Sequence, residues 1–117
     1  MIAASFRPVT RADCRWLWQL RNHPSVAAQS FSTEPIPYKN HCRWFRNFRA
    51  DGKRQLDIFQ LDNLAYNEDC RVGYVRADPY AQGQILSWAI SPTYQGKGLG
   101  AQMLRLWCGG QPQPLWA

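Results

Sequence analysis

The sequence predicts a single α+β domain, in which helices and antiparallel strands occupy separate stretches of the chain. Its 117 residues match the size of one domain, and its six Trp, five Tyr and five Phe provide the aromatic area that a folded core needs. The residue patterns follow in the order strand, helix, helix, three strands, helix. Because the three strands are joined by short connections, we expect them to form an antiparallel meander.

The first strand is expected at residues 2–7, where apolar and polar residues alternate. The first helix follows, with Thr10 as its N-cap and Asp13 in the capping-box position. Its apolar residues recur at helical spacing: Cys14, Leu17 and Leu20. We expect this helix to reach Asn22, because the residue before Pro24 is pushed out of helical geometry.

The second helix is expected from residue 38 to residue 50, after an irregular stretch at 25–37 that contains two breaking prolines. Asp51 and Gly52 form its stop signal. Its apolar side consists of His41, Trp44, Phe45 and Phe48. Its other side is basic and carries Lys39, Arg43, Arg46 and Arg49.

Three strands are expected where β-branched and aromatic residues cluster between turn signals: residues 55–61, 70–76 and 84–90, with turns at 62–69 and 78–83. A glycine-rich turn then leads into a last helix, whose apolar residues are Leu99, Met103, Leu106 and Trp107. We expect this helix to end at Gly109 and Gly110. The chain therefore divides into a domain at residues 1–108 and an irregular tail at residues 109–117.

The composition excludes several classes of protein. Lys and Arg number 14 against 8 Asp and Glu, and the formal net charge of +6 favours an anionic partner. The four cysteines form no Cys-x-x-Cys pair and the two histidines no zinc-finger spacing, so we expect reduced cysteines and no metal. No apolar run approaches the roughly 18 residues of a membrane span, and the N-terminus lacks a signal-peptide pattern. We expect a cytoplasmic protein without membrane contact.

The most informative segment, residues 95–100, reads Gln-Gly-Lys-Gly-Leu-Gly and lies between a predicted strand and the first turn of a helix. The N–H groups and dipole of a helix start attract anions, and glycines let the backbone approach closely. We therefore expect a phosphate or pyrophosphate site, to which Lys97 adds a positive charge. A nucleotide P-loop is excluded because Gly98, not Ser or Thr, follows Lys97. A Rossmann site is excluded because residues 101–117 contain no acidic residue to bind a ribose.

This segment resembles the acetyl-CoA motif of the GNAT acetyltransferases, Gln/Arg-x-x-Gly-x-Gly/Ala, and a hydrophobic-x-Pro lead-in is present at residues 90–92. The resemblance implies the GNAT fold and an acetyl-CoA-dependent N-acetyltransferase. Amides of the turn would bind the CoA pyrophosphate, and the preceding strand, expected to carry a bulge, would pair with the pantetheine arm. The implied acetyl-CoA-binding residues are Trp88, Ala89, Ile90, Gln95, Gly96, Lys97, Gly98, Leu99 and Gly100.

The resemblance also implies how the reaction proceeds. A primary amine of the substrate would attack the thioester directly, with the backbone amide of Trp88 placed to polarise the thioester carbonyl. The amine must lose a proton, so a general base is expected. The sequence does not single this base out, and the candidates are His41, Asp57, Glu68 and Ser87.

The N-terminal half is similar to one GNAT branch, through Leu20-Arg21-Asn22-His23-Pro24, Phe31, Ile36 and His41-x-x-Trp44-Phe45. That branch includes the amino-sugar N-acetyltransferase of pseudaminic acid biosynthesis, which acts on a UDP-linked substrate, and relatives that act on ribosomal-protein N-termini or polyamines. The implied substrate-binding residues are Arg21, Asn22, His23 and His41. The basic side of the second helix either binds the charges of a UDP-linked substrate or is a solvated helix face. His41 either contacts the substrate or packs in the core.

The GNAT family continues past the last helix with a strand, a helix and a final pair of strands. The residues after Cys108 show no strand pattern, so we expect a chain truncated after this helix. The last predicted strand would then keep an open edge, at which we expect a homodimer. Two alternatives to an active enzyme stay open: a CoA-binding fragment without activity, and a basic, aromatic-rich module that binds nucleic acid.

Overall fold

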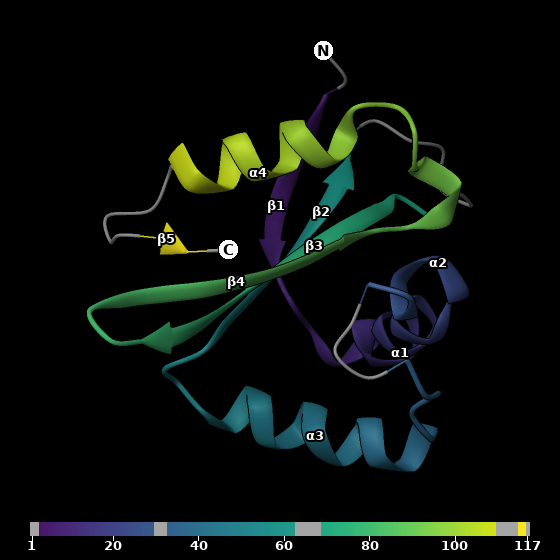
Figure 1. The fold of residues 1–117 in the computed structure, drawn as a ribbon, viewed down its shortest axis with the longest axis vertical. Helices are drawn as coiled ribbons and strands as arrows, with labels where there is room; N and C mark the ends of the chain where they lie inside the picture. The colour runs from purple at the N-terminus through teal and green to yellow at the C-terminus, as the bar shows by residue number, and fades with distance from the viewer. Residues whose placement is uncertain (1–2, 30–32, 63–68, 110–114, 117) are drawn as a thin grey trace.

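The computed structural model describes residues 3–29, 33–62, 69–109 and 115–116. Its elements are β1 (Ala4–Pro8), the 3-10 turn η1 (Arg11–Asp13), α1 (Cys14–Asn22), α2 (Pro24–Ala27), α3 (Tyr38–Ala50), β2 (Gln55–Leu61), β3 (Arg71–Tyr80), β4 (Gly83–Ile90), the 3-10 turn η2 (Pro92–Tyr94), α4 (Leu99–Gly109) and β5 (Leu115–Trp116). One twisted sheet lies at the centre, with α4 on one face and α1 and α3 on the other (Figure 1). The predicted α+β class and element order are confirmed.

The sheet has the strand order β1-β2-β3-β4-β5. The first four strands are antiparallel neighbours, which confirms the predicted meander and adds β1 beside it. β5 pairs in parallel with the start of β4, Leu115 opposite Gln84 and Trp116 opposite Ile85. The prediction of an irregular tail is therefore wrong for Leu115 and Trp116, and β4 is not open along its whole length.

The sheet separates two hydrophobic clusters. The cluster beneath α4 contains the buried residues Phe59, Val72, Val75, Ala77, Leu86, Leu99, Met103 and Trp107. The cluster beneath α1 and α3 contains the buried residues Leu17, Phe45, Phe48, Leu56 and Ile58. Successive side chains of a strand point to opposite faces, so β2 contributes Ile58 to one cluster and Phe59 to the other. The central strands are thus buried on both sides.

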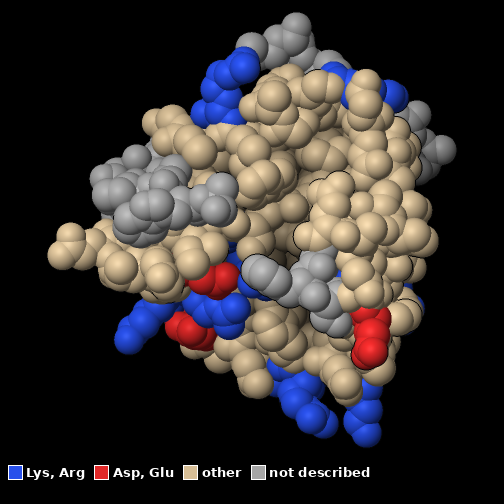
Figure 2. Space-filling model, in the orientation of Figure 1, with Lys and Arg blue, Asp and Glu red and all other residues tan. Residues whose placement is uncertain are grey.

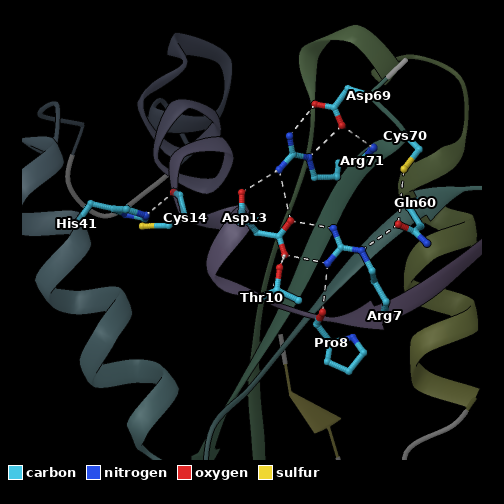
Figure 3. Close-up of polar contacts among 11 residues, drawn as sticks. Arg7, Pro8, Thr10, Asp13, Cys14, His41, Gln60, Asp69, Cys70 and Arg71 are labelled. Atoms are coloured by element: carbon cyan, nitrogen blue, oxygen red, sulfur yellow. Dashed lines mark hydrogen bonds and ion pairs between the residues drawn. The ribbon is translucent and has the colours of Figure 1, made fainter. Parts of the chain in front are cut away.

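A buried carboxylate just before α1 links the start of this helix to the strands β1 and β3 (Figure 3). Asp13 is only 1% exposed. Arg7 donates to it through both terminal nitrogens at 2.8 Å, and Arg71 of β3 contributes a longer contact of 3.4 Å. The amide of Thr10 also donates to Asp13 at 2.8 Å, and the predicted capping box is present. This network fixes the start of the helical face against two strands.

Two segments depart from the predicted boundaries. A short helix, α2, forms within the stretch that the sequence predicts to be irregular. Its first residue is Pro24, at a position where a backbone N–H would have no partner within the helix, so the lack of an N–H in proline costs nothing there. His23 is its N-cap, and the His23 Nδ1 accepts from the amide of Ser25 at 3.2 Å. β3 continues to Tyr80, so the turn to β4 consists of residues 81 and 82, with Ala81 at φ +52°.

The expected bulge in the strand before the glycine turn is not present in the pairing of β3 with β4. That register is unbroken from Gly73 opposite Ile90 to Tyr80 opposite Gly83. The irregularity lies instead between β2 and β3, where Phe59 faces Gly73 and the next residue of β2 faces Arg71. Val72 is therefore the extra residue, and a bulge of this kind turns the strand locally.

Candidate functional site

The glycine-rich turn joins the end of β4 to the start of α4, as the sequence predicts. Gly96 and Gly98 have φ values of +79° and +74°, and a Cβ atom added at either position would meet nothing within 4 Å. This backbone conformation favours glycine. The two glycines are therefore required by the path of the chain, and the space beside them is open.

Backbone donors gather at this turn. The first hydrogen bond of α4 runs from the amide of Gln102 to the carbonyl of Gly98 at 3.3 Å. The amides of Leu99, Gly100 and Ala101 therefore lie in the first turn, before the hydrogen bonds of the helix begin. Such amides have no partner within their helix and carry the positive end of its dipole. The exposed Lys97 comes just before them in the chain, with its Nζ 5.8 Å from the ring of Tyr94. The turn is thus suited to an anion.

The Gln95 side chain braces the turn. Its Nε2 donates to the carbonyl of Ile90 at 3.0 Å and to the hydroxyl of Ser25 at 3.2 Å. The first bond ties the turn to the end of β4, and the second ties it to α2. Gln95 therefore stabilises the turn through hydrogen bonds within the protein.

The end of β4 presents polar backbone groups at a partly uncovered edge. The amide of Ser91 donates to the carbonyl of Val72 in β3 at 2.7 Å. Backbone groups of successive strand residues point to alternate edges, so those of Ala89 face β3 and those of Trp88 and Ile90 face away from it. In the described part of the chain, β5 covers that outer edge only at the start of β4.

A cavity of about 350 Å³ lies on the opposite face of the sheet, between α1, α3 and the strands β2 and β3. Its walls combine apolar and aromatic side chains with two guanidinium groups. The lining residues are Leu17, Arg21, Ile36, Asn40, His41, Trp44, Leu56, Tyr74 and Arg76. Cavities of this volume and composition are typical of sites for small molecules.

His41 is the buried imidazole of this cavity. It is 5% exposed, and its Nε2 lies 2.9 Å from the carbonyl oxygen of Cys14 (Figure 3). Because a carbonyl only accepts, this nitrogen carries the proton, and Nδ1 is left as the basic nitrogen of the neutral ring. Burial lowers the pKa of His41 and outweighs the opposite effect of the bond to Cys14. His41 is therefore both a packed residue and a wall of the cavity.

The charged residues of the cavity come from α1 and β3. Arg76 donates from Nε to Asp78 at 3.0 Å, and its guanidinium lies 5.6 Å from the ring of Trp44. Burial raises the pKa of the Tyr74 hydroxyl, while the positive charges of Arg76 and Arg21 act in the opposite direction. Both guanidinium groups line the same cavity as this hydroxyl group.

Comparison with known families gives a match that includes the glycine turn. A family model described as "Acetyltransferase (GNAT) family" matches residues 16–107. The chain belongs to the GNAT acetyltransferase family. The matched stretch includes most of α1, all of α3, the whole meander and most of α4. Comparison with curated proteins gave no match.

Solved structures share this GNAT fold. An acetyltransferase from Thermus thermophilus is 25% identical, with 95% of this chain and 72% of that chain covered and a TM-score of 0.73. A spermidine N-acetyltransferase from Vibrio cholerae, in complex with CoA and spermine, is 16% identical, with 91% and 62% covered and a TM-score of 0.77. A phosphinothricin acetyltransferase from Sinorhizobium meliloti, in complex with acetyl-CoA, is 17% identical, with 92% and 59% covered and a TM-score of 0.68. This chain thus spans between 59% and 72% of these three chains.

The structure divides the predicted substrate-binding residues of this GNAT chain into two groups. Arg21 and His41 line the cavity together. Asn22 holds the backbone of Ile36 instead, since its side chain accepts from the Ile36 amide at 2.9 Å and donates to the Ile36 carbonyl at 2.8 Å. His23 caps α2 and lies outside the cavity lining.

Two of the remaining general-base candidates, Ser87 and Asp57, lie outside the cavity lining. Ser87 is in β4, opposite Arg76. Asp57 accepts from the indole of Trp107 at 3.1 Å and from Gln55 at 2.7 Å, so its carboxylate is engaged. Glu68 lies outside the described residues. His41 is therefore the one candidate, among those that the structure describes, that lies at the cavity.

The basic side of α3 is exposed. Figure 2 shows Lys and Arg side chains over α3 at the lower edge of the molecule. None of the four basic residues of this side lines the cavity: Lys39, Arg43, Arg46 and Arg49. The cations that line the cavity are Arg21 and Arg76.

Sequence reasoning missed Tyr74 and Arg76 as site residues. The signal that identifies them is the period of two along β3, which places both side chains on the face of the sheet that α1 and α3 cover. Recognising it requires knowing which face carries the cavity.

Three further observations limit the chemistry of the described residues. They contain no group of three or more His, Cys, Asp or Glu side chains placed to bind a metal ion. Their cysteines, at positions 14, 42, 70 and 108, are free thiols. None of the described helices has the length and apolar character that a membrane span requires.

Proposed function

We propose that this GNAT chain transfers the acetyl group of acetyl-CoA to a primary amine. The observation that carries the proposal is the glycine turn, where two residues of positive φ and the first amides of α4 follow a strand with a partly uncovered edge. The solved neighbours from Vibrio cholerae and Sinorhizobium meliloti, which were determined with CoA or acetyl-CoA, support the same ligand.

The backbone would hold the donor in two places. Amides from Gly96 to Gly100 would bind the pyrophosphate, with Lys97 adding a charge. The outer edge of β4 at Trp88, Ala89 and Ile90 would pair with the pantetheine arm, which is an amide chain. The outward-facing amide of Trp88 would donate to the thioester carbonyl, and a donor of this kind is worth about 3 kcal/mol in acyl transfer. Acetyl-CoA supplies the thioester that the amine cleaves.

The acceptor amine would be bound in the cavity on the face of the sheet that α1 and α3 cover. As its nitrogen forms a bond to the carbonyl carbon, the carbon–sulfur bond breaks; one proton leaves the amine and one is taken up by the leaving sulfur. Of the candidate bases, His41 is the one in the cavity, and its lowered pKa keeps Nδ1 unprotonated at neutral pH.

The acceptor that we propose is an amine with negative charge, of which a nucleotide-linked amino sugar is one. The presence of Arg21 and Arg76 in the cavity favours it, together with the similarity of residues 20–24 to the amino-sugar branch. The Vibrio cholerae neighbour is a spermidine N-acetyltransferase, and spermidine is a polycation. A cavity whose described lining holds two guanidinium groups and no carboxylate disfavours such a substrate here.

The experiment that tests donor binding is a thermal shift with acetyl-CoA on the wild type, Gly98→Asp and Gly98→Asn. A ligand at 100 times its dissociation constant stabilises a protein by about 2.7 kcal/mol. Asp and Asn have the same size and both tolerate positive φ, so they separate charge from shape. We expect the wild type to shift, Gly98→Asn to shift less, and Gly98→Asp to show no shift.

Gly52→Asp is the matched control, because Gly52 is exposed in another turn with nothing near it. It should keep the full shift. A Gly98→Asp protein that keeps the shift would contradict the placement of the turn. If acetyl-CoA gives no shift at all while a single-stranded oligonucleotide gives a salt-sensitive one, the nucleic-acid alternative replaces the enzyme. A shift without turnover of any amine would identify a CoA-binding fragment.

A further inference from the structure

The cavity beneath α1 and α3 carries an inference about the acceptor, which rests on the proposed N-acetyltransferase function. We propose that this cavity selects amines that carry an anionic group, with Arg21 and Arg76 holding that group. The apolar part of the same acceptor packs against Trp44 and the aliphatic walls. Arg21 and Arg76 are thus specificity-determining residues.

The first argument is the charge of the lining. Among the described residues, it contains two guanidinium groups and no carboxylate. The neighbouring carboxylate, Asp78, is shared: it accepts from Arg76 at 3.0 Å and from Arg54 at 2.8 Å. One carboxylate is thus shared by two guanidinium groups, and Arg21 is a further guanidinium group of the lining.

The second argument is that both cations and a hydroxyl group share one cavity. Arg21 comes from α1 and Arg76 from β3, and Tyr74 of β3 lines the same cavity. Two cations and a hydroxyl donor in one lining suit carboxylate or phosphate oxygens, which accept several charge-assisted hydrogen bonds.

The third argument is the shape and the other walls. Leu17, Ile36 and Leu56 provide an apolar surface, and Trp44 adds an aromatic wall from α3. Ligand pockets span roughly 300–1,000 Å³, so a cavity of about 350 Å³ suits a molecule the size of an amino acid or a single sugar. The anion is then either the carboxylate of an amino acid or a phosphate group attached to an amino sugar.

The position of the cavity agrees with an acceptor site. Tyr74 and Arg76 form part of its floor and lie opposite Ala89 and Ser87 in the register of β3 with β4. The floor is therefore one strand away from the edge at which we place the thioester. An acceptor whose anion is held by the arginines keeps its amine free to approach β4.

The test measures binding by isothermal titration calorimetry on the full chain, without acetyl-CoA. Two matched ligand pairs serve as probes. L-leucine and 3-methylbutylamine differ only by a carboxylate, and glucosamine 1-phosphate and glucosamine differ only by a phosphate. We expect the anionic member of at least one pair to bind about tenfold tighter or more, since hydrogen bonds to charged groups contribute this much. The pair that shows the difference identifies the source of the anion.

The variants Arg21→Gln and Arg76→Gln should each remove most of that difference. Arg76→Lys keeps the charge and should restore part of it, which separates a charge effect from a folding defect. Arg43→Gln is the matched control, because Arg43 belongs to the basic side of α3 and lies outside the cavity lining. It should bind all four ligands as the wild type does.

Equal or weaker binding of both anionic ligands would overturn the proposal, as would failure of all four ligands to bind. Discrimination that survives in both Gln variants would overturn it as well. These outcomes are separate from the acetyl-CoA shift of the Gly98 variants. A chain that shifts with acetyl-CoA but does not discriminate keeps the proposed function and loses this inference, and the reverse result loses the donor site.

Discussion

At the scale of single residues, Asp13 shows how a buried charge is kept. Burial by itself raises the pKa of this carboxyl, but hydrogen bonds from Arg7 and Thr10 outweigh it and lower the pKa to about 2 from 3.8. A group whose folded pKa is lowered contributes stability above its unfolded pKa and loses it as the pH falls. Asp13 therefore stabilises the fold fully above about pH 4 and loses this contribution as the pH falls to about 2.

Replacing Asp13 by Asn tests this account. The variant leaves Arg7 and part of Arg71 without their anion, and removing one partner of a buried pair costs about 3–5 kcal/mol. We expect urea denaturation at pH 7 to show a loss in this range, and acid titration to show a smaller decline between about pH 4 and pH 2 than in the wild type.

Asp62→Asn is the control, since Asp62 is exposed and its carboxylate accepts from Ser5 at 2.8 Å. It should change stability by less than about 1 kcal/mol. If both variants unfold at the same urea concentration, the network around Asp13 is not the anchor that its burial indicates.

At the scale of elements, β3 and β4 approach each other closely at Gly73. A Cβ atom at this position would collide with the carbonyl oxygen of Ala89 and lie 2.9 Å from the Ile90 Cδ1. We expect Gly73→Ala to destabilise the chain by about 1–3 kcal/mol, the usual cost of overpacking. Equilibrium unfolding in urea measures it.

Gly52→Ala, at a turn with nothing within 4 Å, is the matched change. It should be neutral or slightly stabilising. A Gly73→Ala chain as stable as Gly52→Ala would show that β4 moves freely relative to β3, and the edge that we assign to the thioester would then not be fixed.

The elements also show which parts of the fold can be predicted from the sequence. The helix at 38–50 and the strand at 55–61 form with the predicted bounds, because their apolar periods are strong and turn signals flank both. α2 escapes prediction because Pro24 stops one helix and starts the next. β5 escapes it because its pairing is with a strand distant in sequence, and a two-residue strand has no period of its own.

The candidate site divides in the same way. The glycine turn is local in sequence, so the string at 95–100 is enough to place it between strand and helix. The cavity is assembled from α1, α3, β2 and β3, and its cations at positions 21 and 76 are far apart in the chain. Only the strand order and register bring them together, and no spacing in the sequence encodes that distance.

At the scale of the whole molecule, the sheet belongs to both hydrophobic clusters. Val75 and Ala77 of β3 are buried under α4, while Tyr74 of the same strand packs on the cluster of α1 and α3. The strand β2 is shared in the same way, through Ile58 in one cluster and Phe59 in the other. We expect one cooperative transition in urea, with far-UV circular dichroism and Trp fluorescence coinciding. Trp107 reports one face and Trp44 the other, so separate transitions would show that the faces unfold independently.

The hydrogen bond from Gln95 to Ser25 connects the turn of one site to the helix that follows α1. Two sites joined through the protein obey reciprocity: whatever factor a ligand at the turn applies to the affinity of the cavity, a ligand in the cavity applies to the affinity of the turn. Ser25→Ala removes this contact, so comparing the two affinities in the wild type and in this variant would measure the coupling free energy that the contact carries.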